Sequence, residues 1–253
     1  MSLLLTDQAW PDLVDREPLV VLPLGACEQH GPHLPVDTDT AIATAVARSA
    51  VGELAGDIDV LLAPEQPYAA SGEHEGFPGT VSIGCEALQL LLVELGRSLL
   101  CWAGRLLIVN GHGGNSRTLA QAVARLRDES RDVAWWSHLP GDADAHAGRT
   151  ETALMMALKP PAVHAERAKP GRTEPIGELL PELMRTSVRH VSPNGVLGDP
   201  AGASTADGER MLSVMVERLC ADARSWHVTP SGRLLPCRIP SGRPEGAAAG
   251  PQG

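Results

Sequence analysis

The chain is poor in aromatic and basic residues, and this limits the partners that it can bind. It contains one Tyr and one Phe, and its 21 Lys and Arg residues are outnumbered by 31 Asp and Glu residues. The resulting net charge of −10 would repel the phosphates of nucleic acids and the headgroups of anionic membranes. The scarcity of aromatic rings also argues against a stacking surface for single-stranded nucleic acid. We therefore expect neither nucleic acid nor a membrane as a partner.

The sequence also lacks the segments that direct a protein to or through a membrane. No window reaches about 18 continuous apolar residues, the length of a membrane span. The chain opens at Met1 and meets Asp7 without a basic segment or a long apolar stretch before it. The five cysteines are odd in number and show no C-x-x-C spacing, which is typical of reduced cysteines in the cytosol. We therefore predict a cytoplasmic protein.

Short apolar runs alternate with amphipathic segments along most of the chain. The runs predict strands at residues 18–25, 58–63, 105–109 and 133–137. The amphipathic segments predict helices at 40–55, 84–103, 115–128 (with Asn115 as its cap), 152–158, 176–184 and 206–226. This alternation predicts an α/β fold whose mostly parallel sheet is covered by helices on both faces. We expect one domain over residues 1–235 and a disordered tail over residues 236–253, which are rich in Pro, Gly and Ala.

Polar residues gather in the segment that directly follows the first predicted strand. It contains Glu28, His30 and Asp39. Glu28 and His30 are two residues apart, so an extended backbone would point both side chains to the same side, and the carboxyl ends of parallel strands are where ligands bind. These three residues are therefore candidate metal ligands, whereas His33 and Asp37 suit supporting or turn positions. Taken alone, the segment could equally be a polar turn in which Asp39 caps the next helix.

A glycine-rich loop follows the third predicted strand. In the motif Asn110-Gly-His112-Gly-Gly-Asn115, three glycines let the backbone around the histidine approach a ligand closely. A phosphate-binding turn is the alternative, but the loop lacks the P-loop lysine and the full dinucleotide pattern. We therefore take His112 as a candidate metal ligand and Gly113 as part of a substrate pocket.

Two further segments carry acidic and imidazole groups. His146 and Glu151 are five residues apart and cannot share a helical face, so we place His146 in the loop before a helix that begins near Glu151. The alternative is a solvated helix start with a favourable N-terminal carboxylate. A long segment without periodicity holds Ser71, Glu73 and His74, and such segments often bind substrate. We assign these three residues to the pocket wall.

Together, these segments place three carboxylates and two imidazoles at the ends of successive strand–helix units: Glu28, Asp39, Glu151, His30 and His112. Oxygen and nitrogen ligands without a thiolate suit Zn²⁺, Mn²⁺ or Fe²⁺. The pattern therefore predicts a metal-dependent enzyme more strongly than any one segment does.

The same motifs resemble the creatininase family of amidohydrolases. The resemblance runs from about residue 18 to residue 205 and rests on Glu28-Gln-His30-Gly-Pro-His-Leu-Pro with Thr38-Asp39, Asn110-Gly-His112-Gly-Gly-Asn115, His146-Ala-Gly148 with Glu151-Thr152, and Gly195-Val-Leu-Gly-Asp199-Pro. It implies a three-layer αβα sandwich, usually in a homo-oligomer such as a hexamer. It also implies two divalent metal ions in each subunit, Zn²⁺ or Fe²⁺, with Mn²⁺ as a further option.

The resemblance implies a role for each site residue. The ligands of the two ions would be Glu28 and His112 for one, His30 and Glu151 for the other, and Asp39 for both. His146 would contact the substrate and move protons. Creatininase has a glutamate at the position of Gly114 and a tryptophan at the position of Asp142, so creatinine itself is not the expected substrate.

Within the family, the chain is most similar to peptidases that cleave a modified precursor peptide near its C-terminus. This likeness is carried by residues 40–48, 70–74, 82–88 and 100–102. It implies a peptide substrate, and as products a leader peptide and a small lactam formed from a terminal Val-Tyr pair.

Three alternative functions stay open from the sequence. The chain could hydrolyse a formamide or a small cyclic amide, as other members of the family do. It could be a metal-binding scaffold subunit without activity, although the presence of all five ligand positions together with His146 argues against this. The glycine-rich loop could instead bind a nucleotide without a metal.

Overall fold

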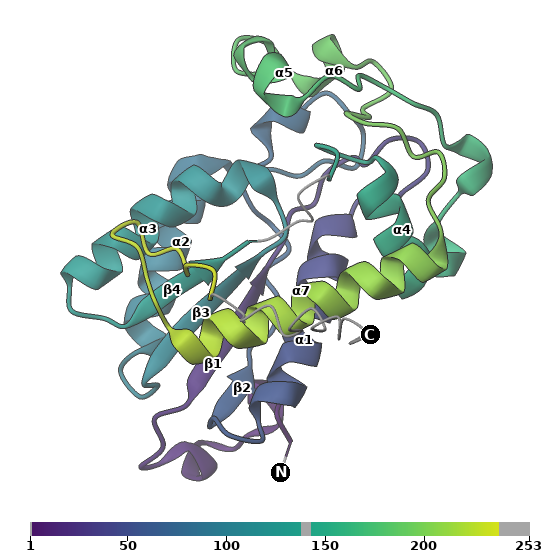
Figure 1. Ribbon diagram of the computed structural model, residues 1–253. Coiled ribbons are helices and arrows are strands. Elements are labelled where there is room, and N and C mark those ends of the chain that lie inside the picture. Colours follow the sequence, from purple (N-terminus) through teal and green to yellow (C-terminus); the bar gives the residue numbers. More distant parts are fainter. Residues whose placement is uncertain (1, 138–142, 238–253) are drawn as a thin grey trace, which may run out of the picture.

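The computed structural model describes residues 2–137 and 143–237. Four strands form one parallel sheet in the order β2-β1-β3-β4 (Figure 1). The strands are β1 (Leu19–Leu24), β2 (Val60–Leu62), β3 (Arg105–Asn110) and β4 (Val133–Trp136). Each lies where the sequence predicts a strand. The predicted tail from residue 238 onward, and Asp142, lie outside the described residues.

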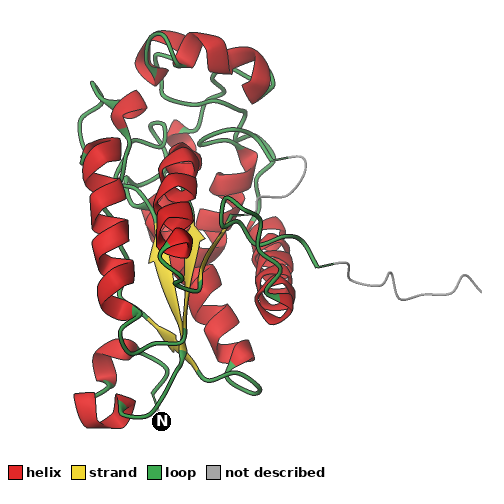
Figure 2. Ribbon diagram, turned by 90° about the vertical axis from the view of Figure 1, so that its left-hand side faces the viewer, coloured by secondary structure: helices red, strands yellow, loops and turns green. Residues whose placement is uncertain are grey.

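Helices cover the sheet on both faces. They are α1 (Thr38–Leu54), α2 (Gly84–Leu99), α3 (Ser116–Asp128), α4 (Arg149–Leu158), α5 (Ile176–Leu183), α6 (Val188–Val191) and α7 (Thr205–Ser225). Short 3₁₀ turns occur at Leu5–Asp7, Trp10–Leu13, Gly72–His74, Gly113–Asn115, Pro160–Ala162 and Ala165–Arg167. Figure 2 shows the sheet between its two helical layers, so the predicted three-layer αβα sandwich is confirmed. No helix in this part of the chain is long and apolar enough to cross a bilayer.

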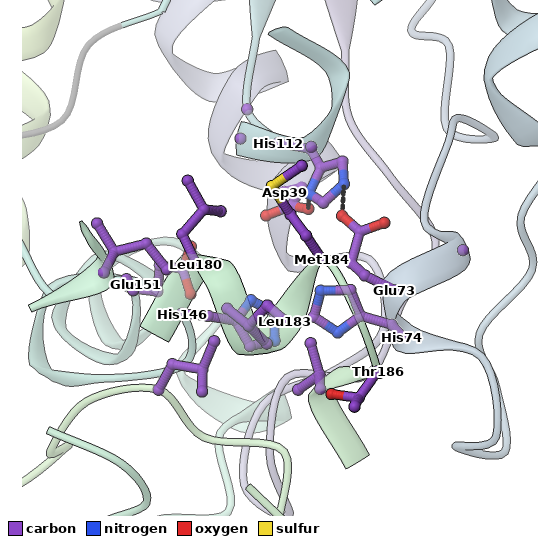
Figure 3. Close-up of a pocket in the computed structure, with 18 residues that line it drawn as sticks. Asp39, Glu73, His74, His112, His146, Glu151, Leu180, Leu183, Met184 and Thr186 are labelled. Carbon is purple, nitrogen blue, oxygen red and sulfur yellow. Dashed lines mark ion pairs between the residues drawn. The ribbon is translucent and has the colours of Figure 1, made fainter. Parts of the chain in front are cut away.

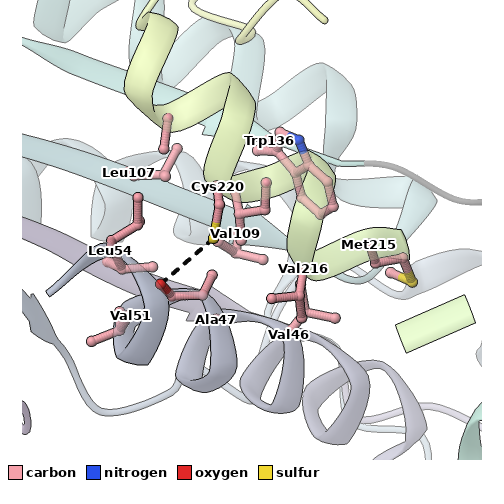
Figure 4. Close-up of a cluster of buried hydrophobic side chains, with 14 of the residues drawn as sticks. Val46, Ala47, Val51, Leu54, Leu107, Val109, Trp136, Met215, Val216 and Cys220 are labelled. Atoms are coloured by element: carbon pink, nitrogen blue, oxygen red, sulfur yellow. Dashed lines mark hydrogen bonds between the residues drawn. The ribbon is translucent and has the colours of Figure 1, made fainter. Parts of the chain in front are cut away.

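Two hydrophobic clusters hold the layers together, one on each face of the sheet. On the first face, Val46 of α1 and Val216 of α7 pack against Val109 of β3 (Figure 4). The Cys220 thiol also lies there and donates to the carbonyl oxygen of Ala50 at 3.7 Å. On the second face, α2 and α3 contribute fully buried leucines: Leu88, Leu92, Leu119 and Leu126. Each such side chain contributes about 1.5–3 kcal/mol through burial.

The order of the strands creates a crevice at the carboxyl ends of β1 and β3. From β1 the chain runs through α1 to β2 on one side, and then returns through α2 to β3 on the other side of β1. The helices that leave β1 and enter β3 therefore lie on opposite faces, and the carboxyl ends of β1 and β3 are neighbours. In open parallel sheets this reversal point is where ligands bind.

Two glycines bring the start of α1 directly over this reversal point. A Cβ atom at Gly25, just after β1, would overlap Thr40 of α1. A Cβ atom at Gly111, just after β3, would overlap the carbonyl oxygen of Asp39. Because neither glycine has a side chain, the first turn of α1 can contact the ends of both strands.

Asn115 stands at the cap position of α3, as predicted, but its side chain does not cap the helix. Its amide nitrogen donates to the carbonyl oxygen of Gly25 and to Oδ1 of Asn110, both at 3.1 Å. Its side-chain oxygen accepts from the backbone nitrogen of Ala70 at 3.3 Å. The predicted capping role is therefore wrong, because this buried amide instead ties together three loops around the crevice.

Candidate metal centre

The five predicted metal ligands meet above the carboxyl ends of β1 and β3. All five side chains are buried although they come from separate segments: Glu28 and His30 after β1, Asp39 in the first turn of α1, His112 after β3, and Glu151 in the first turn of α4. Burial of Glu151 excludes the solvated helix start that the sequence left open. His146 lies in the loop before α4, as predicted, and borders the same cavity (Figure 3).

Two triads of these side chains share one carboxylate, and a third group brings His146 close to Glu28 and His30. The ligand atoms of Glu28, Asp39 and His112 lie within 4.8 Å of one another, and the same holds for His30, Asp39 and Glu151. Oδ1 of Asp39 is 3.1 Å from Nε2 of His30, and its Oδ2 is 3.4 Å from Nδ1 of His112. The Asp39 carboxylate thus faces both triads, one oxygen to each, as a bridging ligand would.

The carboxylate oxygens at the centre of the cluster are poorly compensated. Both oxygens of Glu28 and Oδ2 of Asp39 are buried and have no hydrogen bond to any residue that the structure describes. Oε1 of Glu28 has only imidazole nitrogens close by, at 3.2 Å in His112 and 3.3 Å in His74. Burying charge without a partner is costly, and bound cations are one of the few ways to offset that cost. The donor set therefore fits divalent metal ions.

The pKa values show how the site balances its charge without a metal ion. Burial opposes the charged form of His30, but Asp39 and Glu151 outweigh burial and raise the pKa of His30 to about 10. Burial raises the pKa of Glu151 to about 7 against the opposing pull of His30. The site thus retains protons among its carboxylates, and metal ions that took the same positions would displace them.

His146 lies between two other imidazoles, with ring centroids 4.2 Å from His30 and 4.5 Å from His74. Its Nε2 is 2.8 Å from the carbonyl oxygen of Gln29 and 3.0 Å from the amide nitrogen of the same residue. The two hydrogens of that amide are directed to His74 and to the carbonyl of Gly195, so we assign the ring proton to Nε2, which donates to the Gln29 carbonyl. The unprotonated Nδ1 faces Oε1 of Glu28 at 3.8 Å. Burial, with the neighbouring His30 and His74, holds the pKa of His146 well below its usual value. His146 is therefore a neutral imidazole with a free lone pair toward the cluster.

Sequence reasoning missed Gln29, which lies between two ligands and organises the imidazoles. Its Nε2 is 2.9 Å from Nδ1 of His74 and 3.0 Å from the carbonyl oxygen of Gly195. Its Oε1 accepts from the backbone nitrogen of Gly31 at 2.8 Å. An amide that donates to Nδ1 of His74 leaves the proton of that ring on Nε2, which faces Glu28. Alternation along the segment points residue 29 away from residues 28 and 30, so only the loops packed behind it reveal this role.

Part of the cluster, namely Asp39, His112 and Glu151, lines a cavity of about 640 Å³ together with His146 (Figure 3). Of the four predicted pocket residues, Glu73, His74 and Gly113 line it. Ser71 does not line it: its side chain is fully buried beside the wall, and its backbone nitrogen donates to the Ser82 hydroxyl. His33 and Asp37, which we placed in supporting or turn positions, lie outside the triads. His33 binds the Thr152 hydroxyl, and Asp37 pairs with Lys159.

The opposite wall of the cavity is apolar and comes from α5 and the segments after it. Its residues are Ile176, Leu180, Leu183, Met184, Val188 and Leu197. The sequence predicts α5 as a helix, and the spacing of its apolar residues at positions 176, 180, 183 and 184 marks one face. That spacing alone does not show whether the face covers the core or, as here, a ligand cavity.

Comparisons with known proteins find relatives in both sequence and fold. The sequence model of the creatininase family (creatinine amidohydrolase) matches residues 5–222. The chain is 50% identical over 220 residues to the mycofactocin precursor peptide peptidase of Mycolicibacterium smegmatis. This alignment covers 86% of this chain and 89% of that protein. A mutant creatininase of the Zn-Zn type has a TM-score of 0.76 at 26% identity, covering 89% of this chain and 98% of the other. A creatininase described with Mn has a TM-score of 0.72 at 26% identity, with 89% and 99% covered.

Proposed function

Because this chain belongs to the creatininase family, we propose that it is a metal-dependent peptidase that cleaves a modified mycofactocin precursor peptide near its C-terminus. The family predicted from the sequence motifs is thereby confirmed. The observation that carries the proposal is the convergence of five buried ligand groups, three of which (Asp39, His112 and Glu151) line an open cavity. The products would be a leader peptide and a small lactam formed from the terminal Val-Tyr pair.

In this proposal Glu28 and His112 would hold one divalent ion, His30 and Glu151 would hold a second, and Asp39 would contribute to both. Zn²⁺, Fe²⁺ and Mn²⁺ all suit these ligands. When bound, such ions polarise an amide carbonyl and lower the pKa of a coordinated water. The uncompensated oxygens of Glu28 and Asp39 provide the negative charge that would hold them.

His146 is positioned to move the proton that amide hydrolysis requires. Its Nδ1 has a free lone pair and faces the cluster, so it can accept a proton from the attacking water. The same nitrogen can then give this proton to the departing amine. Because the Gln29 carbonyl holds the other nitrogen, the ring does not need to turn over between the two steps.

The apolar wall supports a peptide substrate rather than a small polar amide such as creatinine. Ile176, Leu180 and Met184 are about half exposed or more, yet all three line the cavity that contains the metal cluster. With the scissile bond of the peptide at the metal cluster, the neighbouring side chains of the peptide would reach this wall and bury apolar surface against it. Helix α5 would therefore hold the end of the peptide over the metal site.

The proposal is tested by loading the protein with Zn²⁺, Fe²⁺ or Mn²⁺ and offering it the modified precursor peptide, the unmodified peptide, creatinine and a formamide. Mass spectrometry should show cleavage of the modified peptide near its C-terminus. Turnover of a small amide without cleavage of the peptide would favour the alternative hydrolase, and the absence of turnover in metal-loaded protein would favour a scaffold.

Variants separate metal binding from proton transfer. Glu28→Ala and His112→Ala should lose both metal and turnover. His146→Ala should keep its metal content and lose about 100-fold or more in turnover, a range typical of a missing proton-transfer group. His227→Ala, which changes an exposed histidine outside the cavity, serves as the matched control. Because the nitrogens of His146 also approach Glu28 and His30 closely, loss of metal in His146→Ala would make it a ligand instead.

A further inference from the structure

Glu73 is a carboxylate of the cavity wall that neither triad includes. It lies in the 3₁₀ turn Gly72–His74, and its side chain is 36% exposed, toward the cavity. Its Oε1 is 3.2 Å from Nε2 of His112 (Figure 3). The other nitrogen of that ring, Nδ1, faces Glu28 and Asp39. The imidazole of His112 therefore lies between Glu73 on one side and the candidate ligands Glu28 and Asp39 on the other.

The neighbouring Gly114 leaves the space in which this contact forms. Its φ is not in the left-handed region, so the backbone does not require glycine there. A Cβ atom at position 114 would instead overlap Oε1 of Glu73 and Nε2 of His112. A Cβ atom at the adjacent Gly113 would meet no atom within 4 Å. Of these two positions, only 114 must lack a side chain for the contact between Glu73 and His112 to form.

We propose that Glu73 is a positioning residue for the metal ligand His112. A neutral imidazole donates from one nitrogen and accepts at the other. With its charge 3.2 Å from Nε2, Glu73 holds the ring proton on that nitrogen and so keeps the lone pair on Nδ1, where it faces the ion that Glu28 and Asp39 would share. Carboxylates that hold a ligating histidine in this way fix its orientation and strengthen its basicity. This inference rests on the proposed metal centre.

The backbone carbonyl of Ala70 also lies 3.2 Å from Nε2 of His112 and can share its proton. A carbonyl is neutral, so on its own it would fix the ring nitrogen that carries the proton but supply less negative charge. The distinct contribution of Glu73 is that charge.

The test is the metal affinity of purified protein, measured by competition between each variant and a chelator for Zn²⁺ and for Mn²⁺. Glu73→Gln keeps an acceptor without the charge and should lose about 10-fold in affinity, whereas Glu73→Ala should lose up to about 100-fold. The absorption spectrum of the Co²⁺-loaded protein should change in both variants because the ligand field of His112 changes. Glu75→Gln alters an exposed carboxylate of the same loop and should match the wild type.

A pair of glycine variants tests the geometry independently of the carboxylate. Gly114→Ala should weaken metal binding by pushing Glu73 and His112 apart, whereas Gly113→Ala should leave metal affinity unchanged.

Wild-type affinity and an unchanged Co²⁺ spectrum in Glu73→Gln would overturn the proposal. Normal affinity with lost turnover would do so too, because Glu73 would then act on the substrate. A wild type that binds no metal would refute the metal centre itself, whereas one that binds metal but leaves the peptide intact would refute only the peptidase function.

Discussion

At the scale of single residues, the site depends on which nitrogen of each imidazole carries a proton. Gln29 contributes most to this order, since its amide donates to His74 and to the carbonyl of Gly195, while its oxygen accepts from Gly31. Its backbone carbonyl holds His146 in turn. Gln29, which lies between the candidate ligands Glu28 and His30, therefore orients the imidazole rings of His74 and His146, and both rings face Glu28.

Replacing Gln29 with Ala should remove the side-chain bonds but keep the carbonyl. The backbone groups of Gly31 and Gly195 would lose their partners, and each unsatisfied buried group costs about 1–3 kcal/mol. We expect a lower free energy of unfolding in urea and slower turnover, because His74 could then take either tautomer. Gln121→Ala, the same change at an exposed position of α3, should leave both quantities unchanged. Equal stability of Gln29→Ala and the wild type would show that water replaces the amide.

Local patterns in the sequence indicate the candidate ligands, but they do not indicate the residues that orient them. Glu28 and His30 are found from a two-residue spacing after an apolar run, which is a local pattern. Glu73 and Gln29 act on rings that lie tens of residues away along the chain, so their roles depend on how the loops pack. Periodicity contains no information about such contacts.

At the scale of the elements, the placement of Glu151 depends on the packing of α4 against α7. Gly208 of α7 lies against α4, and a Cβ atom there would overlap the carbonyl oxygen of Ala153. Asp144 accepts from the backbone nitrogens of Arg149 and Thr150 and thereby caps the start of α4. These two features fix the position of the first turn of α4, which carries the ligand.

Gly208→Ala should therefore separate α4 from α7 and displace Glu151. Overpacking of this kind costs about 1–3 kcal/mol, and metal affinity should fall together with the urea midpoint. Gly52→Ala is the matched control, because a Cβ atom there meets nothing within 4 Å of its place in α1. That change should stabilise the protein by about 0.4–1 kcal/mol. A Gly208→Ala protein that keeps its midpoint and its metal affinity would contradict this account of the helix pair.

The longer elements could be predicted because each buries a continuous face. All six residues of β1 are buried, and α2 repeats leucines at helical spacing, so both appear as apolar patterns. Helix α6 was not predicted, because its four residues are too few to show a period. The position of α5 over the cavity was not predicted either, since an apolar face looks the same whether it covers a core or a ligand.

At the scale of the whole molecule, the proposed metal centre adds a polar link between elements that one hydrophobic cluster already packs together. Its ligands come from the loops after β1 and β3 and from the first turns of α1 and α4. Ions bound there would connect the sheet to both helices at the reversal point of the strands. Ligands that bind only the folded state stabilise it in proportion to their affinity and concentration. Metal removal should therefore lower the melting temperature of the entire domain.

The pH dependence of that melting temperature should reverse when metal is removed. In the metal-free protein the pKa of Glu151 is raised from 4.5 to about 7, and that of His30 from 6.5 to about 10. A raised pKa means that the folded state holds a proton more tightly than the unfolded state. The resulting stability is fully present below the unfolded pKa and is lost as the pH rises through the folded pKa. The melting temperature of the metal-free protein should therefore fall between about pH 7 and pH 9, by roughly 2–4 °C per kcal/mol for a domain of this size. Below this range the lowered pKa values of His33, His74 and His146 act in the opposite direction.

Metal-loaded protein should behave in the opposite way, because ligands must lose protons to bind and affinity then increases with pH. Scanning calorimetry in chelator and in excess Zn²⁺, at about pH 6, 7.5 and 9, would measure the gap between the two melting temperatures, which should widen with pH. In Glu151→Gln the metal-free curve should lose its step near pH 7 and keep the decline toward pH 9 that belongs to His30. A metal-free melting temperature that stays level or rises between about pH 7 and pH 9 would mean that Asp39 and Glu151 do not hold a proton on His30. The site would then balance its buried carboxylates by some other means.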